Sequence, residues 1–146
     1  MVKTGGGKMP TFEINYLAVL VSAAAGFVIG ALWYSVLFGK VWMKLSGMDS
    51  KKIGKEKKKG MIKSYAAGFA VLVVMAFVLA HFVDMAEAAT VLEGAQAGFW
   101  AWLGFVATVM LNKVLWEGKP FKLYLLDASH YLVVLLVMGS VLAVWV

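Results

Sequence analysis

Four long apolar runs constrain the fold of this chain more than any other feature of its sequence. They cover about residues 14–38, 61–83, 94–115 and 121–146. A helix needs roughly 20 apolar residues to cross the hydrocarbon core of a bilayer, and each run supplies that length. The chain is 62% hydrophobic, which is more apolar than an ordinary soluble domain. We therefore predict an all-α fold: one transmembrane domain that is an integral membrane four-helix bundle.

The connections between the runs differ in charge. We expect residues 39–60 to form a Lys-rich loop, whereas the second connection is acidic and the third region carries Lys113, Lys119 and Lys122. Lysine in short loops marks the cytoplasmic side of a multi-pass protein. We therefore expect a cell-membrane protein with the Lys-rich loop in the cytoplasm and both termini outside.

The lysines of this first connection also suggest partners. They are either a topology signal in a solvated loop or a surface that binds anionic lipid headgroups or an acidic partner. Every basic residue in the chain is lysine, so no guanidinium is available to bind bases or phosphates in a bidentate way, and we expect no nucleic-acid partner. The candidate headgroup contacts are Lys51, Lys52, Lys55, Lys57, Lys58 and Lys59.

Small residues recur at helical spacing inside two of the runs. Ser22, Gly26 and Gly30 are four residues apart in the first run, and Gly104 belongs to a small or polar stripe in the third. Small residues allow the backbones of neighbouring membrane helices to approach closely. The stripes indicate packing within the bundle or a dimer face, and we expect a homo-oligomer or a subunit of a membrane complex.

Two ionisable residues, Asp127 and His130, interrupt the fourth run three positions apart. On a helix they share a face, about 9 and 13 Å from its first residue. Because such groups are costly against lipid, they must face protein or water. Tyr34, Thr108 and Asn112 are expected in the same half of the membrane, so we predict one inner polar cluster.

This predicted cluster has three interpretations. It could hold helices together if Asp127 bonds to Asn112, Tyr124 or a lysine. It could handle protons or ions, because histidine titrates near neutral pH. A metal site would need Glu117 or a partner chain as a further ligand. The chain has no cysteine and no recognisable catalytic motif, so we predict no catalytic residue, no metal and no cofactor.

A second group of ionisable residues lies at the opposite side of the predicted membrane. His81, Asp84 and Glu87 recur every third residue near the end of the second run. They suggest either a weak surface cation site or a solvated helix end.

Several motifs resemble an uncharacterised membrane family, domain of unknown function 1761. They are residues 30–35 (GALWYS), continued by 37–40 (LFGK) and 42–43 (WM), then 102–108 (WLGFVAT), 117–120 (EGKP) and 127–131 (DASHY). Many members have Pro where this chain has Val36, so the end of the first helix is expected to differ. The resemblance implies a small multi-span membrane protein, and it implies no activity, substrate, cofactor or functional residue.

For function, the leading expectation is a structural or accessory membrane component that is not an enzyme. The alternative is a small proton- or ion-coupled carrier or channel that uses Asp127, His130 and Asn112. An intramembrane enzyme is the remote third possibility.

Overall fold

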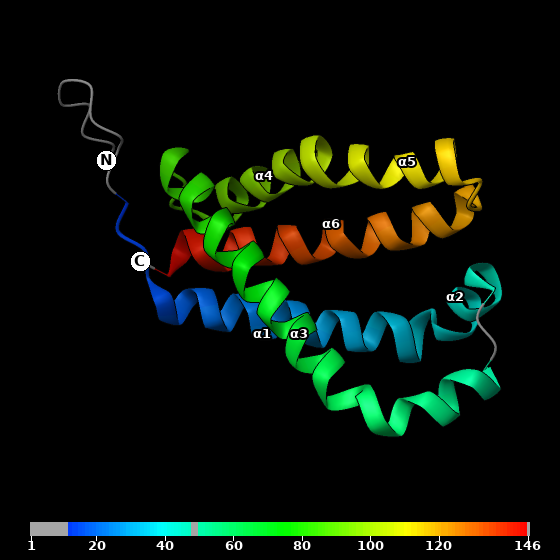
Figure 1. The fold of residues 1–146 in the computed structure, drawn as a ribbon. Helices are drawn as coiled ribbons and strands as arrows, with labels where there is room; N and C mark the ends of the chain where they lie inside the picture. The colour runs from blue at the N-terminus through cyan, green and yellow to red at the C-terminus, as the bar shows by residue number, and fades with distance from the viewer. Residues whose placement is uncertain (1–11, 48–49, 146) are drawn as a thin grey trace.

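The computed structural model describes residues 12–47 and 50–145, apart from the side chains of residues 50–59 and 61. All regular structure in this part of the chain is helical, which confirms the predicted all-α class (Figure 1). The elements are α1 (Tyr16–Leu32), η1 (Trp33–Leu37), α2 (Gly39–Ser46), α3 (Ser50–Met85), α4 (Val91–Trp102), η2 (Leu103–Ala107), α5 (Thr108–Glu117) and α6 (Phe121–Val144). The two η elements are π-helical turns within longer helices.

Four helical segments in the described residues are long and apolar enough to cross a membrane. They are Tyr16–Leu37, Ile62–Met85, Val91–Glu117 and Phe121–Val144. Each overlaps one of the four apolar runs of the sequence. The first span combines α1 with η1, and the third combines α4, η2 and α5, so both are continuous helices with a wide turn inside them.

Side chains at the helix ends explain where two of the spans begin. The Asn15 side chain accepts hydrogen bonds from the backbone N–H groups of Leu17 and Ala18, at 3.1 and 3.2 Å. Thr90 and Glu93 form a capping box, in which each side chain accepts a bond from the other residue's backbone N–H. These bonds satisfy backbone donors that the first turn of a helix leaves free.

The connection expected as a Lys-rich loop is largely helical. It contains α2, which ends at Gly47 with a φ of 73°, and the first turns of α3. Lysine is a good helix former, so a lysine-rich segment can continue the helix of the adjoining span. The six candidate headgroup lysines fall in these first turns, and their side chains lie outside the described residues.

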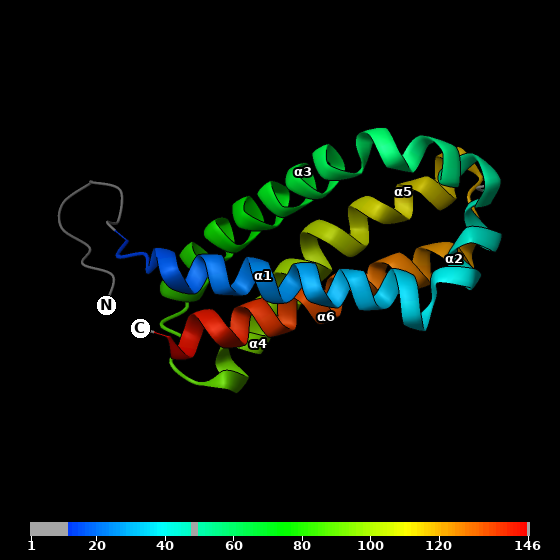
Figure 2. The same ribbon diagram turned by 90° about the horizontal axis from the view of Figure 1, so that it is seen from below.

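Helix α6 lies at the centre of the bundle. In Figure 1 it runs between the α4–α5 helix on one side and α1 on the other, while α3 crosses diagonally. Its buried residues are Ala128, His130, Val134, Leu135, Met138, Gly139, Leu142 and Ala143. The start of α1 and the end of α6 lie at the end of the bundle opposite α2 (Figure 1). The second view shows α3 diverging from α1 towards the α2 end (Figure 2).

Three glycines set the distance between α4 and α6. A Cβ atom on Gly94 would collide with the backbone of Gly139, and one on Gly98 would collide with the backbone of Leu135. Helix backbones approach this closely only where side chains are absent. At these glycines the backbones of α4 and α6 are in direct contact. The sequence analysis did not select any of the three.

The small residues that the sequence analysis did select divide into two groups. Ser22 and Gly26 are buried in the bundle, and Gly30 faces His130. Gly104 is exposed, and a Cβ atom there would have no neighbour within 4 Å. Gly104 therefore does not pack within the described bundle, and the alternative of a face between copies of the chain stays a prediction.

We predict opposite effects for the same substitution at Gly98 and Gly104. Gly98→Ala should lower the free energy of unfolding by about 1–3 kcal/mol, because the new methyl group overpacks the α4–α6 contact. Gly104→Ala meets open space and should leave stability unchanged or raise it by a few tenths, because alanine favours helix. Unfolding of each variant in lipid–detergent micelles measures both effects. Equal stability of the two variants would contradict the close approach of α4 and α6.

Candidate functional site

Tyr34 and Asp127 form the main polar contact in the half of the bundle nearest α2. The Tyr34 hydroxyl donates a hydrogen bond of 2.6 Å to Oδ1 of Asp127. Tyr34 belongs to the π turn η1, where the Phe38 N–H bonds back five residues to the Trp33 carbonyl oxygen at 2.8 Å. The bond links the first span to α6. The carboxylate thus points into the protein, as a charged group in a membrane helix must.

His130 lies one turn further along α6 and is only 6% exposed. Its ring packs against Tyr34 and Tyr131, with ring centroids 4.9 and 4.8 Å away, and Trp33 lies at 6.0 Å. Gly30 makes room for it, since a Cβ atom there would be 3.2 Å from Nε2. Neither ring nitrogen has a hydrogen-bond partner among the described residues. His130 is therefore a buried polar group that the rest of the described chain leaves unsatisfied.

Asn112 and Thr108 do not join this cluster. Both are exposed, and the Thr108 hydroxyl donates to the Gly104 carbonyl of its own helix at 2.6 Å. The cause is the π turn η2, which adds one residue to a turn and rotates the following face by about 100°. Ala107, Met110 and Val114 take the inward positions instead. The prediction that Asn112 and Thr108 belong to the inner cluster is therefore corrected.

Three further hydrogen bonds tie α6 to the third span. The Trp102 indole donates to the Ala128 carbonyl at 2.7 Å, and the Tyr124 hydroxyl donates to the Ala107 carbonyl at 2.9 Å. The Ser140 hydroxyl lies 3.1 Å from the Val91 carbonyl. The sequence analysis offered Tyr124 only as a partner for Asp127. Trp102, Tyr124 and Ser140 share one sequence feature that could have indicated these bonds: each places a hydrogen-bond donor on an otherwise apolar face of a span.

Two crevices lie on either side of the Tyr34–Asp127 bond. The larger, of about 740 Å³, is bounded by α1, η1, α3 and α6, and both Tyr34 and His130 line it. The smaller, of about 200 Å³, opens near Lys113 and Lys119 and is lined by Asp127. The hydrogen bond from Tyr34 to Asp127 thus connects residues that face different crevices.

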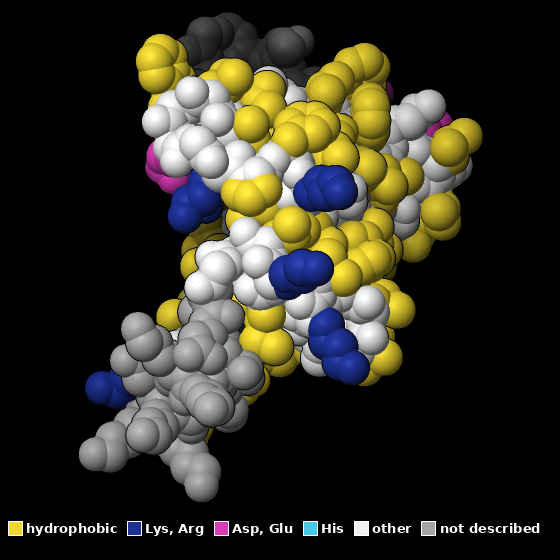
Figure 3. Space-filling model, turned by 90° about the vertical axis from the view of Figure 1, so that its right-hand side faces the viewer, with side chains coloured by type: hydrophobic (Ala, Val, Ile, Leu, Met, Phe, Trp, Pro, Cys, Tyr) yellow, Lys and Arg dark blue, Asp and Glu magenta, His cyan; other side chains and the backbone are white. Residues whose placement is uncertain are grey.

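The α2 end of the bundle is rich in lysine. Figure 3 views this end and shows lysine side chains spread among apolar ones. The exposed lysines there are Lys40, Lys44, Lys113, Lys119 and Lys122. The opposite end carries Glu13, Asp84, Glu87 and Glu93, so the two ends of the described bundle differ in charge.

The residues of the suggested outer cation site do not converge. Nδ1 of His81 donates to the Phe77 carbonyl oxygen at 2.8 Å, and its ring packs between Phe12 and Phe77. Glu87 lies beyond the end of α3, in a turn with a φ of 52°. The described residues contain no group of three His, Asp or Glu side chains able to hold a metal ion. The described structure therefore does not bring His81, Asp84 and Glu87 together, and it is compatible with the alternative interpretation, a solvated helix end.

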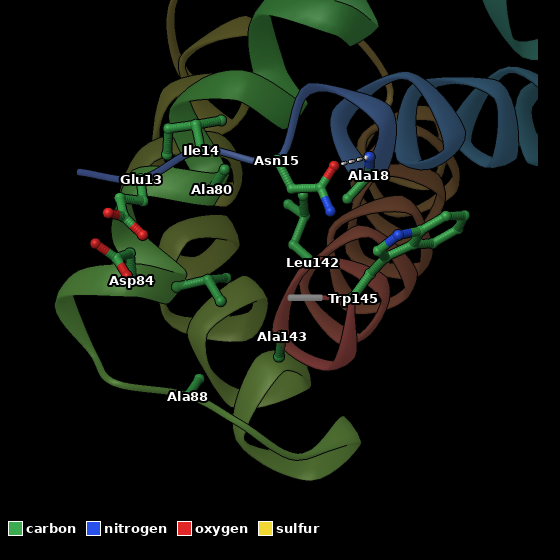
Figure 4. A pocket seen from close by; sticks show the side chains of 11 residues that line it. Glu13, Ile14, Asn15, Ala18, Ala80, Asp84, Ala88, Leu142, Ala143 and Trp145 are labelled. Carbon is green, nitrogen blue, oxygen red and sulfur yellow. Dashed lines mark hydrogen bonds between the residues drawn. The ribbon is translucent and has the colours of Figure 1, made fainter. Parts of the chain in front are cut away.

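Asp84 instead faces a different carboxylate. Figure 4 shows Asp84 and Glu13 pointing towards each other at the edge of a cavity of about 290 Å³. Asn15 and Trp145 also line this cavity. Asp84 comes from the end of α3, and Glu13 precedes α1, so this pairing depends on how the two helices pack.

The family model described as "Protein of unknown function (DUF1761)" matches residues 17–143, which is most of the chain. No curated protein and no solved structure matches.

We predict that Tyr34 and Asp127 are coupled energetically. Tyr34→Phe should destabilise the protein by about 1 kcal/mol, because it removes one interhelical hydrogen bond and little else. In a double-mutant cycle with Asp127→Ala, the coupling energy should also be about 1 kcal/mol. Chemical unfolding of the four proteins in micelles measures it.

Tyr16→Phe is the matched control for this cycle. Tyr16 lies on the same helical span, but its side chain is exposed near the opposite end. Removing the Tyr16 hydroxyl should leave the free energy of unfolding within a few tenths of a kcal/mol of the wild-type value. A coupling energy near zero between Tyr34 and Asp127 would show that the hydrogen bond contributes nothing to helix packing.

Proposed function

Since this chain belongs to the DUF1761 family, a family described as of unknown function, we propose its role from the geometry of its helices. The protein is a non-enzymatic structural or accessory component of a membrane. The observation that carries this proposal is the Tyr34–Asp127 hydrogen bond. It engages the half-buried Asp127 carboxylate in holding two helices together, which is how polar groups commonly act inside membrane proteins.

The charge difference between the two ends supports an orientation. The lysine-rich end faces the cytoplasm, and both termini face the outside of the cell membrane. In this orientation Lys40, Lys44 and Lys119 lie near the anionic headgroups of the inner leaflet. Each such lysine near an anionic surface contributes about 1 kcal/mol to attraction.

The protein acts as a homo-oligomer or within a larger membrane complex. The outward turn of η2 supports this proposal, because it leaves Gly104 and Thr108 exposed on one side of the third span. A second helix can approach closely at such small residues. The four spans also enclose little room for a solute path, since α6 occupies the centre of the bundle.

A second candidate function is a small proton- or ion-coupled carrier or channel. Its support is the position of Asp127, which lines the crevice beside Lys113 and Lys119 while its partner Tyr34 lines the crevice at His130. A change in the Tyr34–Asp127 bond would alter the barrier between these two crevices. Ionisable residues inside membrane spans commonly mark such pathways.

Ion flux through liposomes separates the two candidates. For a structural component, purified protein should give the same proton and cation flux as protein-free liposomes. Asp127→Asn and His130→Gln should then change thermal stability without changing flux. If the wild type carries a current that either variant abolishes while its fold survives, the carrier role is correct and the structural proposal is wrong.

Native mass spectrometry from gentle detergent tests the assembly. We expect a homo-oligomer or a co-purifying membrane partner. Gly104→Leu should reduce that assembly, because it adds bulk to the exposed side of the third span. Gly60→Leu, on α3 in equally open space, is the matched control and should leave it intact. A wild-type protein found only as a monomer would contradict the proposal.

A further inference from the structure

The largest crevice in the described bundle lies between α1 and α3. These helices diverge towards the α2 end in both views, and the crevice there has a volume of about 740 Å³ (Figures 1 and 2). Sites for small molecules and cofactors commonly have volumes of 300–1,000 Å³ and mostly apolar walls. Phe27, Val71 and Leu72 supply such walls here, and Gly68 leaves the α3 side open.

His130 gives this crevice a polar end. Its side chain is more than nine-tenths buried, it lines the crevice, and neither ring nitrogen has a partner among the described residues. A buried polar group without a hydrogen bond costs about 1–3 kcal/mol. A ligand that supplied this bond would recover that cost as binding free energy. The crevice therefore favours a molecule with a hydrogen-bonding head and an apolar tail.

The neighbours of His130 restrict the head group. Asp127 lies one turn away on the same helix, and its negative charge disfavours an anionic head such as a fatty-acid carboxylate or a phosphate. The rings of Trp33, Tyr34 and Tyr131 surround the imidazole, and such rings prefer offset or edge contacts with another planar ring. A neutral planar ring with carbonyl oxygens satisfies both conditions.

We propose that the α1–α3 crevice binds a lipid-soluble quinone, with its ring beside His130 and its isoprenoid chain along Phe27, Val71 and Leu72. One ring nitrogen of His130 donates a hydrogen bond to a quinone carbonyl oxygen. The chain reaches the bilayer between α1 and α3, so the ligand enters from the lipid. This inference goes beyond the structural role proposed above and beyond the sequence, from which we expected no cofactor.

Binding to the full-length protein in nanodiscs tests the proposal. The probe is a naphthoquinone with a short isoprenoid chain, and the readouts are its saturable binding and the rise in thermal stability that it causes. Oleate and phosphatidylglycerol are the comparison ligands, since they carry apolar chains with anionic heads. The naphthoquinone should stabilise the wild type, and the two anionic lipids should neither do so nor compete with it.

Three variants locate the site. Gly68→Leu projects a side chain into the crevice from open space, so it should abolish binding while the fold survives. Gly60→Leu makes the same change on the same helix outside the crevice, and it should bind as the wild type does. His130→Phe keeps the ring shape but removes the hydrogen bond, and it should weaken binding about fivefold to tenfold.

Each contrary result overturns the proposal. Equal binding by the wild type and Gly68→Leu would place the probe outside the crevice. Equal binding by the wild type and His130→Phe would mean that His130 is only a packed core residue. Stabilisation by oleate or phosphatidylglycerol but not by the naphthoquinone would assign the crevice to an anionic lipid.

Discussion

The hydrocarbon core of a membrane offers no hydrogen-bond partners, and the rest of this structure depends on that constraint. Every span is helical, because a helix satisfies its own backbone groups. Several polar side chains inside the bundle then bond across helices, either to another side chain or to a backbone carbonyl. Tyr34 reaches Asp127, Trp102 reaches Ala128, and Tyr124 reaches Ala107. All three bonds involve α6, so the same constraint that excludes water also makes α6 the centre of the bundle.

The two π turns determine which polar residues take part. The first turn, η1, contains Tyr34, which bonds to Asp127. The second turn, η2, rotates the Thr108 and Asn112 side chains out of the bundle. A π turn interrupts the regular helical ladder, and such turns are often found at functional sites. Here η1 supplies Tyr34 itself, and η2 ends at Ala107, whose carbonyl accepts the bond from Tyr124. Local backbone geometry, rather than residue type, thus selects the members of the cluster.

Buried polar atoms of Ser22, Trp33 and His130 depart from this pattern among the described residues, and of these three residues His130 lines the α1–α3 crevice. The residues around it are aromatic, and Gly30 gives it space, yet neither nitrogen is bonded within the described chain. A structural core would gain stability from an apolar residue at this position. A binding site has a physical reason to keep the imidazole, because an unsatisfied group is paired only when the ligand is present. A ligand in the crevice would thus account for the unpaired imidazole of His130.

The sequence by itself determined the all-α class, the four apolar spans, the family and the presence of Asp127 and His130 on one face of the last helix. These depend on length, hydropathy and helical periodicity, which are local properties of the chain. Only the tertiary structure decided that Tyr34 bonds to Asp127, that Gly94, Gly98 and Gly139 form the closest contact, and that Asn112 and Glu87 lie away from their expected sites. The physical reason is that a single wide turn rotates every later side chain of its helix without changing the pattern of apolar residues. The packing of helices that are far apart in the sequence is likewise not a local property of the chain.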